Sequence, residues 1–146
     1  MKEYTYIMIK PDGVRKGLTE EIIKRIHSKG FEIKIFDVRK LTDEILDEHY
    51  AHVKDKLFYP EMKSFMLSDY VVPMIVWGEN AVQGMRELMG PTKSSEAPAG
   101  TIRGDYGNKE LVSENIIHGS DSRENALIEI ERFFNLKLNH NEDVEI

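Results

Sequence analysis

One stretch of the chain, Asn115 to Ser122, holds the residue types best suited to chemistry. Two isoleucines there lead to a single histidine, His118, and a glycine and three residues that favour helix N-caps follow it. A segment with helical apolar spacing begins at Arg123, so we expect His118 to lie beside a helix N-terminus, where unpaired N–H groups attract phosphate. A near-neutral imidazole beside an anion site can accept a phosphoryl group. Because a lone histidine at such a corner is more often structural, the stretch alone only suggests this chemistry.

Basic residues elsewhere in the chain could hold a polyphosphate. They are Lys10 at the end of a predicted strand, Arg86 at the border of a helix's apolar stripe, Lys93 with its neighbour Thr92, and Arg103 in a glycine-rich loop. Arginine gives bidentate hydrogen bonds to phosphate, and lysine gives a compact charge. Each of these residues, taken alone, is more often a solvated surface charge. The chain has neither a P-loop nor a G-x-G-x-x-G motif, so a nucleotide would have to be bound without them.

Glu129 follows His118 on a predicted helix, at the edge of that helix's apolar stripe. A carboxylate there could accept a hydrogen from the imidazole, fix its tautomer and stabilise developing positive charge. An exposed helix glutamate is the simpler interpretation of Glu129 by itself. Ser120 and Ser122 are plausible helix caps whatever the function.

Two further histidines, His49 and His52, lie three apart on a predicted helix face and could pair as metal ligands. Two helical ligands with no third partner nearby in sequence are weak evidence for a metal, so we expect no site there. His27 and His140 are predicted to be surface residues.

The totals for the whole chain exclude several classes of protein. With 146 residues, 40% of them hydrophobic and 32% charged, the chain has the size and composition of one globular domain, residues 1–146. The absence of cysteine excludes disulfides and thiolate metal sites and fits a reducing compartment. No secretory signal pattern and no apolar run of roughly 20 residues is found, so we expect a cytoplasmic protein without a membrane segment. The net charge of −6 argues against general nucleic-acid binding.

Apolar spacing predicts strands over residues 4–9, 31–38, 70–77 and 115–117, with helices between them and after the last. This order predicts a βαββαβ core, a four-stranded antiparallel sheet with helices on one face. Pro73 has no N–H for a sheet ladder, so we expect a sheet edge or a bulge there.

Two segments of the chain lack any periodic pattern. Residues 90–114 are rich in glycine and proline, and a loop of that length inside a domain is usually functional or disordered. Residues 135–146 form a polar, acidic tail that we expect to be weakly ordered.

Four motifs in order resemble those of the nucleoside diphosphate kinase family. They are Lys10–Val14, Glu48–Tyr50, Gly100–Asp105 and Asn115–Ser122, and the similarity extends from Tyr4 to about Phe134. The resemblance implies an α/β (α+β) fold of the ferredoxin-like type. It also implies a ping-pong reaction in which a nucleoside triphosphate such as ATP donates its γ-phosphoryl group to a histidine. A nucleoside diphosphate then collects that group, with broad base specificity.

The resemblance assigns roles to residues by their motif positions. The phosphorylated residue would be His118, through Nδ1, with Glu129 and Ser120 orienting its ring through the other nitrogen. The nucleotide contacts would be Lys10, Arg86, Thr92 and Arg103 at the phosphates, Lys10 and Asn115 at the ribose, Tyr50 near the transferred group and Phe58 stacked on the base. Mg²⁺ would bridge the nucleotide phosphates, with Asp121 as a neighbour through water. Members assemble as homo-oligomers, and a hexamer is favoured here over a tetramer.

Departures from the family pattern leave some points open. The segment between Arg103 and Asn115 is slightly longer than the commonest form, so the path of residues 106–114 and a base contact by Val112 are undecided. Two other functions also fit parts of the sequence. One is a catalytically idle nucleotide-binding protein, and the other is a nucleic-acid-binding domain of the same fold, which the net charge of −6 disfavours.

Overall fold

β-branched and aromatic residues form a four-stranded sheet in the order β2-β3-β1-β4, with every neighbouring pair antiparallel. The computed structural model describes all residues, 1–146. The strands are β1 (Lys2–Ile9), β2 (Glu32–Phe36), β3 (Val72–Glu79) and β4 (Ile117–Gly119). The helices are α1 (Pro11–Arg15), α2 (Thr19–Ser28), α3 (Asp43–His49), α4 (Tyr59–Leu67), α5 (Ala81–Met89), α6 (Ile102–Tyr106) and α7 (Arg123–Phe134), with 3-10 turns η1 (Ala51–Val53) and η2 (Ser94–Glu96). The predicted ferredoxin-like fold class is confirmed, and no helix has the length and apolar character needed to cross a membrane.

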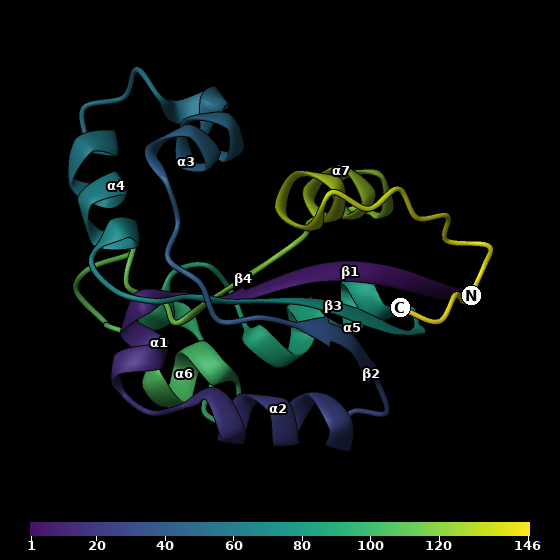
Figure 1. Cartoon of the computed structure of the whole chain (residues 1–146). Coiled ribbons are helices and arrows are strands. Elements are labelled where there is room, and N and C mark those ends of the chain that lie inside the picture. The colour runs from purple at the N-terminus through teal and green to yellow at the C-terminus, as the bar shows by residue number, and fades with distance from the viewer.

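The sheet is covered on both faces, so the prediction of helices on one face was wrong (Figure 1). One buried cluster joins the sheet to α2 and α5, and the other joins it to α3, α4 and α7. The physical reason lies in the central strands. Residues from Glu3 to Ile9 are all buried, whichever face of β1 their side chains occupy, and β3 is equally buried from Val72 to Gly78. Continuous burial of this kind requires packing on both sides of a strand.

Pro73 lies in an interior strand, and the expected sheet edge is not found. Its carbonyl accepts a hydrogen bond from the N–H of Asp37, one residue beyond the end of β2. Proline has no N–H to donate back to the carbonyl of Asp37. Regular pairing with β2 accordingly ends at Phe36, and only an isolated bridge between Arg39 and Val71 lies beyond it. The irregularity in this part of the sheet is a shift of register in β2, between Ile33 and Ile35.

The C-terminal tail is packed against the domain, which corrects the prediction of weak order. Leu136, Leu138 and Val144 contact the cluster beneath α7, and the tail returns toward the start of β1 (Figure 1). His140 is buried and not a surface residue. Its Nδ1 accepts a hydrogen bond from the N–H of Tyr4 (3.1 Å), and its Nε2 donates to the carbonyl of Arg123 (2.6 Å).

The segment from Gly90 to Glu114 contains η2 and α6, two short elements that periodicity could not indicate. The hydroxyl of Thr101 caps α6 by accepting a hydrogen bond from the N–H of Gly104 (3.0 Å). Lys109 closes the other end, because its ammonium group donates to the carbonyls of Ser94, Arg103 and Gly104. These bonds fix the internal conformation of the segment that carries Arg103.

Candidate active site

His118 lies within β4 and pairs with Met8 of β1. This strand ends at Gly119 and not at Ile117, and α7 begins only at Arg123. His118 is therefore held by the sheet, and its ring contacts Glu129 in the middle of α7, not the helix N-terminus that we predicted. The N-terminus of α7 is capped by Ser122, whose hydroxyl accepts from the N–H of Asn125.

Glu129 fixes the orientation of the His118 ring. The Oε1 atom of Glu129 lies 2.9 Å from Nε2 of His118 and accepts a second hydrogen bond from the hydroxyl of Ser120 (2.6 Å). Burial raises the pKa of Glu129, but the hydrogen bonds from His118 and Ser120 prevail and hold that pKa below its usual value. An ionised carboxylate only accepts, so Nε2 carries the imidazole proton and the lone pair of a neutral ring lies on Nδ1.

A strained turn precedes the histidine. Ile116 has a φ of 74°, rare for a β-branched residue, and the N–H of Ile117 bonds to the carbonyl of Asn115 (2.8 Å) across it. Two contacts hold this γ-turn: the N–H of Ile116 donates to the buried carboxylate of Asp12 (3.0 Å), and its carbonyl accepts from the N–H of Lys10 (2.8 Å). Strain kept in place by its surroundings is typical of functional sites.

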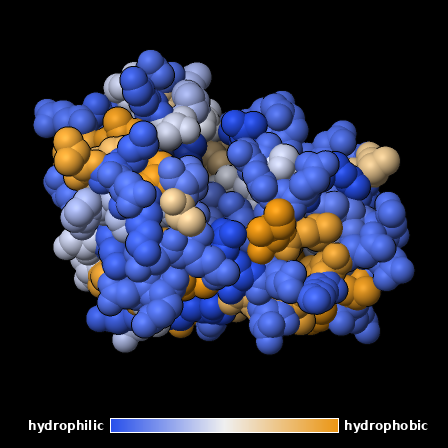
Figure 2. Space-filling view, turned by 90° about the horizontal axis from the view of Figure 1, so that it is seen from above, coloured by the Kyte–Doolittle hydropathy of each residue, from blue (hydrophilic) through white to orange (hydrophobic).

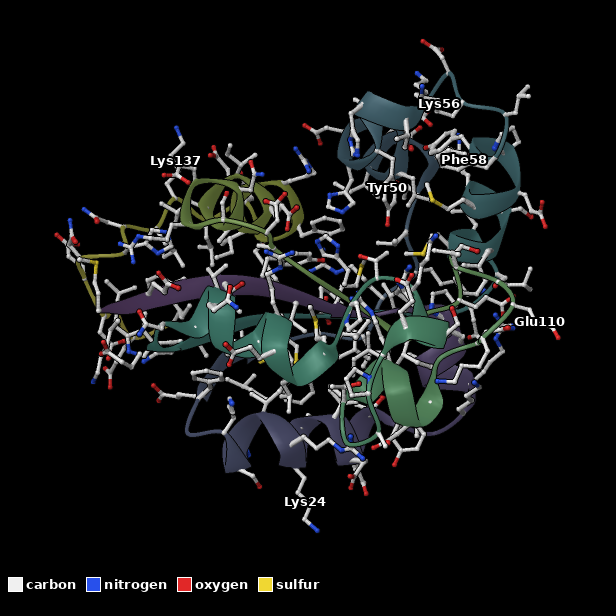
Figure 3. All side chains as sticks on the ribbon, turned by 180° about the vertical axis from the view of Figure 1, so that it is seen from behind. Lys24, Tyr50, Lys56, Phe58, Glu110 and Lys137 are labelled. Atoms are coloured by element: carbon white, nitrogen blue, oxygen red, sulfur yellow. The ribbon has the colours of Figure 1, made fainter.

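A cavity of about 1110 Å³ opens in front of His118 and lies between the α3–α4 segment, the sheet and the loop that follows α6. Its lining includes nine of the predicted site residues: Lys10, Tyr50, Phe58, Arg86, Thr92, Arg103, Asn115, His118 and Asp121. The other two do not line the cavity. Glu129 hydrogen-bonds to His118 from behind, and Ser120 hydrogen-bonds to Glu129. Figure 3 shows Tyr50 and Phe58 on the segment that stands over the sheet, with Glu110 on the loop across from them. The structure thus brings these eleven residues together, whereas Lys93, the remaining basic candidate, does not line the cavity.

Lys10 is a buried cation at the inner end of the cavity. Its Nζ donates to the side-chain oxygen of Asn115 and to the carbonyl of Ser113, both at 2.9 Å. Burial lowers the pKa of Lys10 to about 8, although the carboxylate of Asp12 acts in the opposite direction. The amide of Asn115 also donates to the carbonyl of Thr92 (2.9 Å), so the phosphate-side and ribose-side candidates form one connected network.

Arg103 is also buried and is fixed by three backbone carbonyls. It donates to the carbonyls of Asn115, Gly90 and Ile117 at 3.2, 2.9 and 2.6 Å. Burial and the neighbouring charge of Arg86 lower the pKa of Arg103 to about 10. Two cations are thus held close together with no carboxylate hydrogen-bonded between them, an arrangement that attracts a polyanion.

The outer part of the cavity is apolar and partly open to solvent. Phe58, at the edge of the cavity, is 54% exposed, and Leu111 and Val112 on the loop are each 48% exposed. Exposed apolar side chains around a cavity offer contact area to a flat ligand. Asp121 also lines the cavity and is exposed, with one carboxylate oxygen bonded to the side-chain amide of Asn125 (2.6 Å).

Three residues of the site were missed in the sequence. Asp12 was given no role beyond its place in the Lys10–Val14 motif, yet its buried carboxylate anchors the γ-turn. His49 was considered only with His52, but its ring lies edge-on to His118 with ring centres 4.9 Å apart. Arg132, on α7, donates to Nδ1 of His49 (2.8 Å). The motif around His49 was a usable signal, whereas nothing local marked Arg132.

Comparisons with known proteins agree with one another. A family model described as nucleoside diphosphate kinase matches residues 3–138. A protein named nucleoside diphosphate kinase from Streptomyces coelicolor is 47% identical over 92% of this chain and 97% of its own length. The one from Exiguobacterium sibiricum is 46% identical over 90% of this chain and 94% of its own length.

Solved structures show the same similarity in three dimensions. A halophilic nucleoside diphosphate kinase from Halobacterium salinarum, in complex with CDP, superimposes with a TM-score of 0.87 at 39% identity, over 92% of this chain and 89% of the other. The apo enzyme from Encephalitozoon cuniculi gives a TM-score of 0.85 at 40% identity, over 90% of this chain and 88% of the other.

Proposed function

This chain belongs to the nucleoside diphosphate kinase family, whose members are phosphotransferases, and we propose that it transfers a γ-phosphoryl group through a phosphohistidine at His118. The donor is a nucleoside triphosphate such as ATP, and the acceptor is a nucleoside diphosphate. The single observation that carries the proposal is the hydrogen bond between Nε2 of His118 and Glu129, at the edge of a cavity lined by cations.

In the first half-reaction, Nδ1 of His118 attacks the γ-phosphorus, the bond to the bridging oxygen breaks, and the nucleoside diphosphate leaves. Nδ1 can attack because Glu129 keeps the proton on Nε2, and the same carboxylate stabilises the positive charge that develops on the ring. The hydroxyl of Ser120 holds Glu129 in place. The second half-reaction reverses these steps with another nucleoside diphosphate, which gives a ping-pong mechanism.

The cations supply most of the remaining catalysis, since phosphoryl transfer depends on position and on charge stabilisation. Arg86, Arg103 and Thr92 contact the phosphates in this proposal. Lys10 contacts a phosphate and the ribose, and Asn115 contacts the ribose. The hydrogen bond between their side chains places the two residues side by side for this role. Tyr50 acts as a hydroxyl donor: burial raises its pKa, so it keeps its proton.

The base contact is stacking on Phe58, with no predicted hydrogen bond to a base edge. Broad base specificity follows, because every base has a π-face. Mg²⁺ fits the residues present, since Asp121 offers one exposed carboxylate beside the cavity and Mg²⁺ usually keeps several waters. When bound with the nucleotide, Mg²⁺ neutralises charge on the phosphate oxygens.

The proposal extends to assembly and location. Residues 1–146 act as one catalytic domain, and the chain forms a homo-oligomer, a hexamer in preference to a tetramer. The open edge of β2 supports association, because Phe36 and Val38 beside it are 56% and 55% exposed. On the face that carries α3, α4 and α7, hydrophobic side chains form separate groups within a mainly hydrophilic surface (Figure 2). Light scattering tests the assembly, and cell fractionation tests the predicted cytosolic location.

Brief incubation with γ-labelled ATP and Mg²⁺, followed by denaturation, tests the phosphohistidine. We expect label on the wild-type chain that is acid-labile and alkali-stable, and that added GDP removes as GTP. The variant His118→Ala should carry no label, and His27→Ala, changed at an exposed histidine, should carry as much as wild type. Wild-type chain that binds ATP without becoming labelled would leave only a nucleotide-binding protein.

A further inference from the structure

A second cavity, of about 460 Å³, opens behind the reactive histidine and contains a set of metal-ligand types. His49, His118 and Glu129, from α3, β4 and α7, each offer one ligand atom, and these three atoms lie within 4.8 Å of one another. Two imidazoles and one carboxylate form a donor set that binds Zn²⁺ in enzymes. A metal held there would occupy Nε2 of His118 and remove its hydrogen bond to Glu129.

Arg132 also lines this second cavity and contacts His49 directly. Its Nη1 lies 2.8 Å from Nδ1 of His49. A guanidinium has only donors, so the bond requires a lone pair on Nδ1 and therefore a neutral ring. Burial and the neighbouring His118 lower the pKa of His49 to about 3, which agrees with that geometry.

This bond leaves His49 without a nitrogen for a metal. Nδ1 is occupied by the hydrogen from Arg132, and a neutral imidazole must then carry its own proton on Nε2. In metal sites the arrangement is reversed, since the free ring nitrogen of a ligating histidine donates to a carboxylate or a carbonyl. The permanent charge of Arg132 also repels a divalent cation.

We propose that Arg132 is a positioning residue that fixes the tautomer of His49 and so prevents the cluster of His49, His118 and Glu129 from binding a transition metal. His49 then packs as an uncharged ring, edge-on to the imidazole of His118. The inference rests on the proposed function in one respect: a metal-free His118 is useful because His118 is the proposed nucleophile. The metal chemistry itself does not depend on catalysis.

The test is calorimetric titration of the nucleotide-free protein with Zn²⁺ alone, after treatment with a chelator. Arg132→Met keeps an unbranched, flexible stem and removes both donor and charge. This variant should bind one additional Zn²⁺ per chain, about tenfold or more tighter than any site in the wild type. The double variant Arg132→Met/His49→Phe should lose that site. Arg132→Lys, which keeps a donor and a charge, should behave as wild type.

A matched control removes one positive charge elsewhere. Lys137 follows α7, points away from the domain and is 86% exposed, so Lys137→Met should leave zinc binding unchanged (Figure 3). Kinase assays give a second readout: Zn²⁺ should lower kcat of Arg132→Met far more than kcat of the wild type, with KM for the nucleotide unchanged. Wild-type protein that binds Zn²⁺ through His49 as tightly as Arg132→Met would overturn the proposal. An Arg132→Met variant that gains no site would do the same.

Discussion

The carboxylate of Glu129 determines which nitrogen of His118 carries the proton. In Glu129→Gln the charge is lost and the side chain can present either an amide donor or a carbonyl to Nε2, so the reactive tautomer is no longer enforced. We expect kcat to fall by roughly a hundredfold, with KM for the nucleotide little changed. Steady-state kinetics measure this, with Glu131→Gln, an exposed change on the same helix, as control. Equal losses in both variants would show a helix effect instead.

The buried ammonium group of Lys10 makes nucleotide binding depend on pH. Its pKa of about 8 lies below the ordinary value of 10.5, so the group loses its charge as pH rises through about 8. The Kd for ADP should therefore increase above about pH 8, while Arg103, with a pKa of about 10, keeps its charge until higher pH. Calorimetry between about pH 6.5 and 9.5 measures the change. In Lys10→Arg the increase should disappear, because arginine stays charged throughout.

The titration of Lys10 affects stability in the opposite direction: as pH rises, ADP binding weakens but the folded chain becomes more stable. Between about pH 8 and pH 10.5 the unfolded chain binds a proton at Lys10 that the folded chain has released. The free energy of unfolding of the nucleotide-free protein therefore rises with pH across this interval as far as Lys10 contributes. Burial of the charged ammonium group is the cost of having that charge ready for a phosphate.

At the scale of elements, the sequence predicted the helices and strands whose apolar residues recur periodically. It missed the features that depend on contacts between residues far apart in the chain. The stripes of α2, α5 and α7 and the strand of Tyr4 to Ile9 identified the sheet and its main helices. The end of β4 was misplaced, because the γ-turn at Ile116 is imposed by Asp12, more than a hundred residues away in the chain. The tail was misjudged for the same reason, since its partners lie in β1.

His140 completes the hydrogen bonding of β1 where β4 is too short. Strand β4 pairs with β1 only from Ile7 to Ile9, and the N–H of Tyr4 lies beyond that pairing and donates to the imidazole. In His140→Ala this buried N–H has no partner, which costs about 1–3 kcal/mol of stability. Urea denaturation should show the loss, with kcat nearly unchanged and His27→Ala as an exposed control. Unchanged stability would mean that water replaces the imidazole.

At the scale of the whole molecule, a chain of net charge −6 concentrates cations in one cavity. Lys10, just after β1, lines it together with Arg86 of α5 and Arg103 of α6, whereas acidic groups such as Glu110 lie toward its mouth (Figure 3). A small polyanion can enter and meet these cations. A nucleic-acid strand would also meet the acidic surface around the cavity and gain little from counterion release. We therefore expect the domain to favour a small polyanion over a nucleic acid by both shape and charge.

A ligand in this cavity contacts the sheet, the α3–α4 segment and the loop after α6 at once, so its binding should stabilise the whole fold. ADP at a hundred times its Kd should add about 2.7 kcal/mol and raise Tm by about 5–11 °C. Adenosine at the same concentration lacks the phosphates that Lys10 and Arg103 attract and should shift Tm far less. A single-stranded oligonucleotide should cause no shift at physiological salt. Differential scanning calorimetry separates these cases, and an oligonucleotide that raises Tm as much as ADP does would indicate an RNA- or DNA-binding domain instead.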